Sequence, residues 1–205
     1  MRAMRHGALS KGKRLRPFIT IEVGRMFGAQ EKSLLRGAAA VECMHAYSLI
    51  HDDLPCMDDD DYRRGQPTVH KAFDEATAVL AGDALQALAF EIMVSAETHR
   101  DASMRCKLIE KLTLASGARG MVGGQMIDLL AEHEALDIGA ITRLQRLKTG
   151  EIIAFSCEAG GILGHAAPHQ RSALVSYAHD LGLAFQIVDD LLDAEGDAVQ
   201  TGKPV

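Results

Sequence analysis

The chain has 205 residues, with 22 Lys and Arg against 28 Asp and Glu, and a formal charge of −6. Six acids fall within residues 52–61, and the remaining 22 acids match the 22 bases, so the net charge lies in this one segment. This distribution argues against a nucleic-acid binder, whose footprint would be a basic patch. It also argues against a disordered acidic chain, because 47% of the residues are apolar.

The composition favours helices and a single domain. There is no Trp and only 4% of residues are aromatic, which fits poorly with a β-sandwich or barrel. The four cysteines lie far apart with no C-x-x-C pair, which indicates a reduced, cytoplasmic protein. The longest stretch without Asp, Glu, Lys or Arg, residues 159–170, is too short to span a bilayer. We therefore predict an all-α protein that does not cross a membrane.

Apolar residues recur at helical spacing along almost the whole chain and predict six helices. In chain order these are Pro17–Phe27, Ser33–Leu54, Ala76–Glu97, Ala102–Leu130, Gly139–Gly164 and Arg171–Asp193. The second helix should break near Pro55, and Gly123-Gly124 should cause a kink or a close contact inside the fourth. Helices that are apolar on most sides belong in the middle of a bundle.

The last of these helices ends in a cluster of aspartates. Asp189 and Asp193 are four residues apart, so a helix places both on one face with Asp190 beside them. Carboxylates this close repel one another unless a cation lies between them. Mg²⁺ suits such oxygens, and it usually combines one or two protein carboxylates with phosphate oxygens and water.

A similar cluster, Asp52, Asp53 and Asp58, ends the second predicted helix. Asp58 would lie about 120° from the helical face of Asp52, so Pro55 must redirect the chain for the three to meet. A solvated loop is the alternative for acids 58–61 alone. Acids that interrupt a strongly apolar helix favour a metal site, because a buried carboxylate without a partner is costly. Two facing clusters predict a diphosphate held through Mg²⁺.

Two basic segments accompany the acids. Residues 11–17, K-G-K-R-L-R-P, open the first predicted helix, where backbone N–H groups favour a phosphate. Arg63-Arg64 follow the first acid cluster, and arginine suits bidentate phosphate contacts. Either segment alone could simply be solvated. Together with the acids they suggest two diphosphates, one bridged by metal and one held by cations alone.

These segments resemble the trans-isoprenyl diphosphate synthases, with a match from about Met4 to Lys203. The matching motifs are G-K-R-L-R-P, H-A-Y-S-L-I-H-D-D-L-P-C-M-D-D-D-D-Y-R-R-G, L-A-G-D-A-L, G-G-Q-M-I-D-L, K-T-G and G-L-A-F-Q-I-V-D-D-L-L-D. The resemblance implies an isoprenoid synthase bundle of mostly antiparallel helices around a central active-site cavity. It also implies a homodimer and a Mg²⁺-dependent trans-prenyltransferase that joins isopentenyl diphosphate to allylic diphosphates and releases diphosphate.

The resemblance implies a role for each matching residue. The Mg²⁺ ligands would be Asp52, Asp58, Asp189, Asp190 and Asp193, with Asp53 beside them. Arg63 would contact the allylic diphosphate, and Lys203 would cap it. Isopentenyl diphosphate would be bound by Lys13, Arg16, His45 and Arg64. Lys148, Thr149 and Gln186 would lie near the ionising carbon. A core histidine remains the alternative for His45, and helix packing the alternative for Thr149 and Gln186.

Product length depends on the floor of the cavity. Tyr47 lies five residues before Asp52, roughly 7–8 Å along the helix axis, with Ser48 beside it. An aromatic residue there, with two extra residues in the first acidic motif, resembles bacterial family members that make the fifteen-carbon farnesyl product. The alternative is a twenty-carbon geranylgeranyl product.

The sequence departs from the family pattern at two places, and three alternative functions remain. Lys11 stands where the family usually has Gly, and the chain stops at Lys203-Pro204-Val205. We therefore expect residues 1–205 to be one polyprenyl synthase domain that lacks an N-terminal helix and the C-terminal helices. The rivals are a class I terpene cyclase, a non-catalytic partner subunit of a prenyl synthase and a generic acidic helical adaptor. The cyclase normally lacks the G-K-R segment, and the adaptor leaves the paired aspartates unexplained.

Overall fold

The computed structural model describes residues 1–131 and 136–195, except for the side chains of residues 189, 190 and 192–195. Its helices are α1 (Arg2–Ala8), α2 (Leu15–Met26), α3 (Glu31–Asp52), α4 (Val69–Ala72), α5 (Glu75–Val94), α6 (Ala102–Ser116), α7 (Met121–Ala131), α8 (Ile138–Gln145), α9 (Glu151–Leu163) and α10 (Pro168–Glu195). A π-helical turn, η1 (Arg146–Gly150), joins α8 to α9. Two short strands, β1 (Tyr62–Arg63) and β2 (Gln66–Pro67), pair antiparallel between α3 and α4. The predicted all-α class is confirmed.

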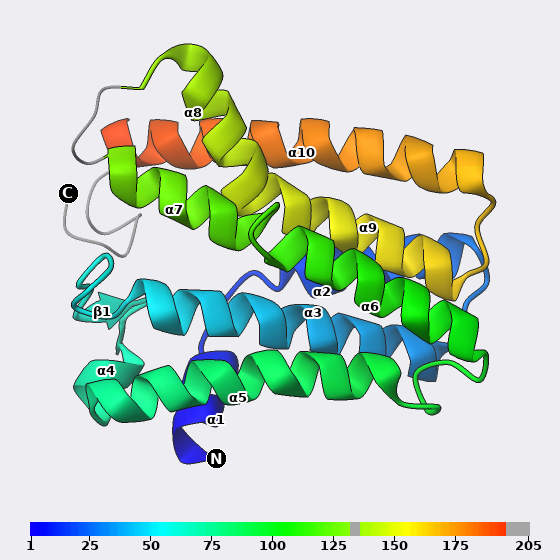
Figure 1. Cartoon of the computed structure of the whole chain (residues 1–205), viewed down its shortest axis with the longest axis horizontal. Coiled ribbons are helices and arrows are strands. Elements are labelled where there is room, and N and C mark those ends of the chain that lie inside the picture. The colour runs from blue at the N-terminus through cyan, green and yellow to red at the C-terminus, as the bar shows by residue number, and fades with distance from the viewer. Residues whose placement is uncertain (132–135, 196–205) are drawn as a thin grey trace.

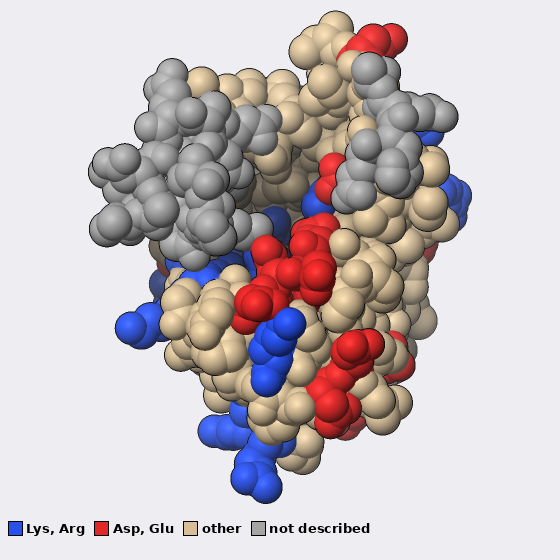
Figure 2. Space-filling view, turned by 90° about the vertical axis from the view of Figure 1, so that its left-hand side faces the viewer, with Lys and Arg blue, Asp and Glu red and all other residues tan. Residues whose placement is uncertain are grey.

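Helix α3 lies at the centre of the bundle, where it packs against α2, α5 and α9 (Figure 1). Leu34, Val41 and Met44 of α3 are fully buried in the main core, together with residues of α5, α6 and α9. An apolar helix enclosed on several sides in this way cannot be shifted without exposing its neighbours. Its carboxyl end, which carries the first acid cluster, is therefore fixed at one end of the bundle. Figure 2 shows acidic side chains gathered at that end, beside a hollow.

The long helices predicted from apolar spacing are present. Helices α2, α3, α5 and α10 match the predictions for 17–27, 33–54, 76–97 and 171–193 to within three residues at each end. The short helices α1 and α4 and the β1–β2 hairpin were not predicted, because elements this short carry too few periodic positions.

The prediction of one helix over Ala102–Leu130 is wrong. The chain instead forms α6 and α7, separated by residues 117–120. Gly117 leaves the helical conformation at ψ −160°, and a Cβ on Gly120 would lie 2.1 Å from the Ala115 carbonyl oxygen. The predicted close contact at Gly123-Gly124 is real, since a Cβ on Gly124 would lie 2.3 Å from the Lys148 backbone nitrogen.

The prediction of one regular helix over Gly139–Gly164 is also incomplete. The structure divides this segment into α8, η1 and α9, and the π turn falls on the K-T-G motif. A π turn inserts one extra residue and rotates the side chains that follow it, and such turns often mark functional sites. Lys148 and Thr149 lie within this turn.

Helix α5 is long and apolar enough to cross a membrane by length and composition, and no other helix among the described residues is. Only a third of its apolar stretch is buried. The buried third packs along α3.

Helices α2 and α9 touch backbone to backbone. A Cβ on Gly160 of α9 would lie 2.6 Å from the carbonyl oxygen of Thr20 and 2.8 Å from the nitrogen of Gly24. Backbone atoms of two packed helices cannot move aside as a flexible side chain can. The contact also fixes the start of α2, which follows the G-K-R segment.

We expect Gly160→Ala to lower the free energy of unfolding by about 1–3 kcal/mol, because the added methyl group overpacks this contact. Gly139→Ala on exposed α8 is the matched control, since its Cβ would meet only the Asp137 side chain, at 3.3 Å. The control should be neutral or stabilising by up to about 1 kcal/mol. Urea unfolding of both variants measures the difference, and equal stability would show that the helices separate easily.

Candidate active site

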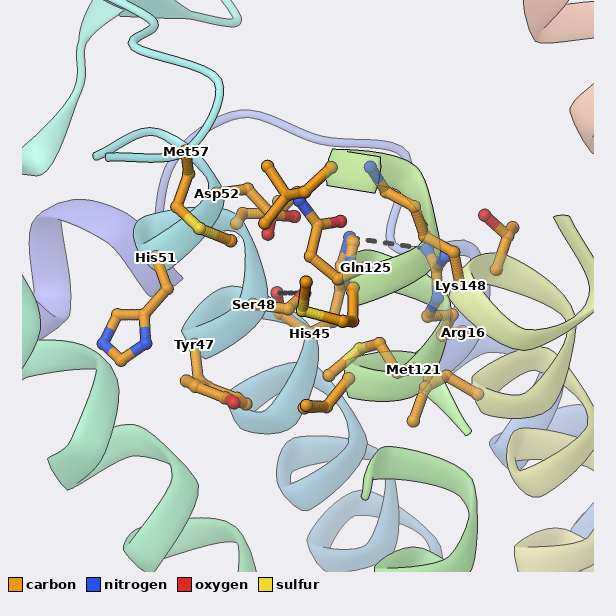
Figure 3. A pocket seen from close by; sticks show the side chains of 16 residues that line it. Arg16, His45, Tyr47, Ser48, His51, Asp52, Met57, Met121, Gln125 and Lys148 are labelled. Carbon is orange, nitrogen blue, oxygen red and sulfur yellow. Dashed lines mark hydrogen bonds between the residues drawn. The ribbon is translucent and has the colours of Figure 1, made fainter. Parts of the chain in front are cut away.

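A cavity of about 390 Å³ opens beside the end of α3 and is bounded by α3, α7 and η1 (Figure 3). Seven residues predicted for the site line it, namely Arg16, His45, Tyr47, Ser48, Asp52, Lys148 and Thr149. Much of the remaining wall is apolar, from Met57, Met121, Val122, Met126, Leu129 and Ile152. The cavity therefore combines a charged mouth with a wall that suits a hydrocarbon.

The chain turns sharply after Asp52. Helix α3 ends there, and the backbone N–H of Asp58 donates to the carbonyl oxygen of Asp52 at 2.9 Å. The backbone N–H of Asp59 likewise donates a hydrogen bond to the Leu54 carbonyl oxygen at 3.2 Å. The predicted redirection at Pro55 is thus present, and it places Asp58 beside Asp52.

The two adjacent aspartates face different surroundings. Asp52 lines the cavity, whereas Asp53 is only 3% exposed and accepts a hydrogen bond from Arg63 Nε at 2.5 Å. Arg63 also donates to Asp60 at 3.2 Å. A buried carboxylate needs such a partner, so Asp53 and Arg63 hold each other in place. Arg63 was predicted to contact a diphosphate, and here it is held by two acids.

Asp52 has no comparable hydrogen-bonded partner among the described side chains. Its pKa is raised to about 6, chiefly by burial and also by the neighbouring carboxylates of Asp58 and Asp53. Lys148 and Arg63 act in the opposite direction without restoring the usual value. Lys148 is itself engaged in an ion pair with Asp128. The mouth of the cavity thus carries negative charge that the described side chains do not neutralise.

The basic residues gather about two helical turns before Asp52, around His45 of α3, which lines the same cavity. Arg16 Nη1 lies 3.4 Å from His45 Nε2. Burial lowers the pKa of His45 well below its usual value, and Arg16 and three further arginines lower it more. His45 is therefore a neutral imidazole among cations, and it borders the cavity rather than the apolar core.

The G-K-R segment and Arg64 meet at this place. A Cβ on Gly12 would lie 2.4 Å from Arg64 Nη1, so the guanidinium rests against the backbone of the segment. Lys13 Nζ lies 5.7 Å from the centre of the Phe185 ring of α10, within reach of a cation–π contact. The structure thus brings together basic residues that lie about 50 positions apart.

The third predicted group meets across η1 and α10. The Thr149 hydroxyl donates to Gln186 Oε1 at 3.1 Å. The preceding residue, Lys148, is held by Asp128 of α7, so Lys148 and Thr149 both have defined positions in the cavity wall, and Gln186 is joined to it through Thr149.

Some predicted residues fall outside the description. Asp189, Asp190 and Asp193 belong to helix α10, but their side chains are not described. Lys203 lies outside the described residues.

Gln125 is a cavity residue to which the sequence assigned no chemistry. Both amide atoms of its side chain are buried without a hydrogen-bond partner, and it extends toward the space between Asp52 and Lys148 (Figure 3). Glu42 was also missed, and it pairs with Arg14 of the G-K-R segment. The apolar wall of α7 was missed for a simpler reason, since apolar residues on a helix look the same whether they line a cavity or fill a core.

The described side chains contain one group of three acids and histidines whose geometry could hold a metal ion. It consists of Asp59, Asp61 and His70, whose ligand atoms lie within 4.8 Å of one another. None of the predicted Mg²⁺ ligands belongs to it.

Comparison with known proteins shows the family. All 205 residues match the family model of the polyprenyl synthetases, and the chain belongs to this family. It is 50% identical to farnesyl diphosphate synthase of Escherichia coli, over 98% of this chain and 68% of that protein. It is 45% identical to farnesyl diphosphate synthase of Haemophilus influenzae, over 100% of this chain and 70% of that protein. A geranylgeranyl pyrophosphate synthase of Catharanthus roseus is 42% identical, over 98% of this chain and 57% of that protein.

Solved structures agree. The crystal structure of an FPP/GFPP synthase from Zymomonas mobilis superposes with a TM-score of 0.92 at 55% identity, covering 96% of this chain and 71% of that one. The crystal structure of a geranyltransferase from Legionella pneumophila superposes with a TM-score of 0.89 at 41% identity, covering 94% of this chain and 68% of that one. The bundle therefore has the isoprenoid synthase fold, as predicted, and the chain is a trans-prenyltransferase.

The two adjacent aspartates should respond in opposite ways to removal of their charge. Because the pKa of Asp52 is raised in the folded state, its ionised form destabilises the cation-free protein at neutral pH. We expect Asp52→Asn to raise the free energy of unfolding by about 1–3 kcal/mol at pH 7.5. Asp53→Asn should lower it by about 1–3 kcal/mol, because Arg63 loses a charged partner.

The measurement is chemical unfolding with the metal removed, between pH 4 and pH 8. The gain from Asp52→Asn should shrink as the pH falls through 6, since wild-type Asp52 then takes up a proton. The exposed Asp180→Asn on α10 is the control and should change little. A gain that stayed constant down to pH 4 would show that the charge of Asp52 is not its cause.

Proposed function

We propose that this chain condenses isopentenyl diphosphate with dimethylallyl and geranyl diphosphates, depends on Mg²⁺ and makes chiefly farnesyl diphosphate. The observation that carries the proposal is the cavity itself. Its mouth brings Asp52, Lys148 and Thr149 together, and its apolar wall leads from there to Tyr47 (Figure 3). A charged mouth above a hydrocarbon-lined space fits a substrate with a diphosphate head and an isoprenoid tail.

The donor chemistry at the mouth fits Mg²⁺. We assign its binding to Asp52 and Asp58 on one side, with Asp189, Asp190 and Asp193 on the other and Asp53 beside the first pair. These residues offer only carboxylate oxygens, which hard cations prefer. The unneutralised charge of Asp52 is what a bound cation would offset. Once bound, Mg²⁺ would supply positive charge to the oxygens of the leaving diphosphate.

The remaining residues of the mouth would favour ionisation of the allylic carbon. Lys148, oriented by Asp128, offers positive charge to the leaving diphosphate, with Arg63 and Lys203 assigned to the same group. The hydrogen-bonded oxygens of Thr149 and Gln186 would turn negative dipoles toward the developing cation. Neither oxygen is a strong nucleophile, and the apolar wall keeps water away from the cation.

The second diphosphate, that of isopentenyl diphosphate, is assigned to the basic end of the cavity, around His45. Lys13, Arg16, His45 and Arg64 converge there. Because His45 is neutral, it can donate a hydrogen bond to the anion, while the arginines supply the charge. The isopentenyl double bond would attack the allylic carbon, and a proton would then pass to the released diphosphate.

Incubation of the protein with Mg²⁺, isopentenyl diphosphate and each allylic diphosphate, followed by sizing of the products, tests the function. We expect elongation to farnesyl diphosphate that stops when the divalent metal is chelated, and a loss of at least 100-fold in kcat in Lys148→Ala. Absence of elongation with every allylic substrate would instead favour the non-catalytic partner subunit.

Tyr47 is proposed to set the product length, with Ser48 beside it. Tyr47 lines the cavity from α3, and its ring packs edge-to-face against His51 at 5.0 Å between centroids. It also contacts buried residues of both neighbouring core clusters, so it stands where the cavity meets the core. A tail that grows along α3 would stop at this ring.

We expect Tyr47→Ala to shift the main product from fifteen to twenty carbons or more, because the ring no longer closes the cavity. Tyr177→Ala removes a tyrosine that is 61% exposed on α10, and it should leave the product unchanged. Chromatographic sizing of the dephosphorylated products gives the answer. An unchanged fifteen-carbon product from Tyr47→Ala would place the floor elsewhere.

We also propose that the protein is a cytoplasmic homodimer formed through the exposed face of α5. Leu80 is 67% exposed on this helix, Val94 54% and Val79 40%. Leu80 and Val94 lie at helical-repeat positions on one face of α5, and large apolar side chains exposed in this way favour an interface. The face opposite it is already occupied by α3.

Leu80→Glu combined with Val94→Lys should convert the dimer to monomer in sedimentation velocity runs, because the charges would be buried without partners. Leu9→Glu introduces a charge at another exposed leucine, outside α5, and should leave the dimer intact. A doubly substituted protein that sediments as the wild type does would exclude this face.

A further inference from the structure

Three side chains beside the cavity form a group that the prenyl transfer reaction does not use. Asp59 and Asp61 lie in the loop before β1, and His70 lies in α4, beyond β2. Their ligand atoms come within 4.8 Å of one another. Both aspartates are exposed, whereas His70 is only 7% exposed, and none of the three lines the cavity.

The hydrogen bonds of Thr68 fix the tautomer of His70. The Thr68 hydroxyl donates to the Asp60 carbonyl oxygen at 2.8 Å, with the Asp61 carbonyl at 3.3 Å. It also lies 3.2 Å from His70 Nδ1. A hydroxyl has one proton to give, so toward the ring it accepts, and Nδ1 carries the hydrogen. In this tautomer, His70 presents a lone pair at Nε2.

That lone pair is buried and has no hydrogen-bond partner. Buried polar atoms nearly always have a partner, so an orphan needs a cause. Within the described part of the chain, His70 makes no ion pair with a carboxylate. A ring that gives its Nδ1 hydrogen to an oxygen and keeps Nε2 free is the usual arrangement of a metal-binding histidine.

We propose that Asp59, Asp61 and His70 form a second cation site, for a first-row divalent transition metal such as Zn²⁺. Two carboxylate oxygens and one imidazole nitrogen suit Zn²⁺, whereas Mg²⁺ is held mainly by oxygen. Lys71 pairs with Asp61 Oδ1 at 2.8 Å, and the other carboxylate oxygen remains available to the metal.

A metal here would close the β1–β2 hairpin at its base. Asp59 and Asp61 precede β1, and His70 follows β2, so the three ligands span the segment that carries Arg63 and Arg64. Thr68 already joins the two ends through its backbone N–H, which donates to the Asp61 carbonyl at 3.0 Å. The metal would thus be structural, and its binding does not require the proposed reaction.

The test is a titration of the metal-free full chain with Zn²⁺ against a chromogenic zinc indicator, in excess Mg²⁺. Wild type should bind one Zn²⁺, and His70→Gln and Asp59→Asn should each weaken binding at least tenfold. Asp59 is exposed with φ +50°, a conformation that asparagine tolerates, so this variant should fold even if His70→Gln does not. Saturating Zn²⁺ should raise the melting temperature of wild type and leave that of Asp59→Asn unchanged.

Two controls separate this site from others. His99 and His165 have Nε2 atoms 3.4 Å apart and are an alternative pair for zinc, so His99→Gln must keep wild-type affinity. Asp52→Asn must keep it too, since Asp52 belongs to the cavity. Equal zinc affinity in wild type, Asp59→Asn and His70→Gln would overturn the proposal. So would loss of binding in His99→Gln alone.

Discussion

The rest of the site depends on negative charge at the carboxyl end of α3 that the described side chains do not neutralise. The bases nearest to Asp52 are already engaged, since Lys148 pairs with Asp128 and Arg63 with Asp53. Burial makes the charge still more costly, as the raised pKa of Asp52 shows. A helical bundle keeps such a feature only at some loss of stability, which fits a site completed by a ligand or metal.

Asp52 and Asp53 have different roles because α3 ends between them. One residue later, the chain leaves the helix, so two neighbours in sequence face different environments. Asp53 turns inward and anchors Arg63, and with it the hairpin. Asp52 faces the cavity, and the turn brings Asp58 back to it. A single helix end thus supplies both an anchor for the basic segment and an open carboxylate for the cavity.

The sequence predicted those parts of the fold that depend on local periodicity. Helices α2, α3, α5 and α10 have long apolar patterns, and the redirection at Pro55 follows from proline and helix geometry. The break at residues 117–120 and the π turn at K-T-G depend instead on close contacts between segments, such as that of Gly124 with Lys148. Periodicity could not show which apolar residues of α7 face a cavity. Nor could it show that the Asp59, Asp61 and His70 side chains meet across a hairpin.

The opposite charges at the two ends of the cavity would determine which diphosphate binds at each end in the proposed reaction. Carboxylates lie at the end of α3, and arginines gather near Arg16 and His45 one to two turns earlier. Burial and four arginines keep His45 neutral, so it can meet an incoming anion as a hydrogen-bond donor while the arginines supply the charge. A diphosphate that arrives with Mg²⁺ is favoured at the acidic end, and one without it at the basic end. In the proposed reaction, two substrates that both carry diphosphates would be distinguished by the charge that accompanies them. Their reacting carbons would meet between the two ends, near Lys148 and Thr149.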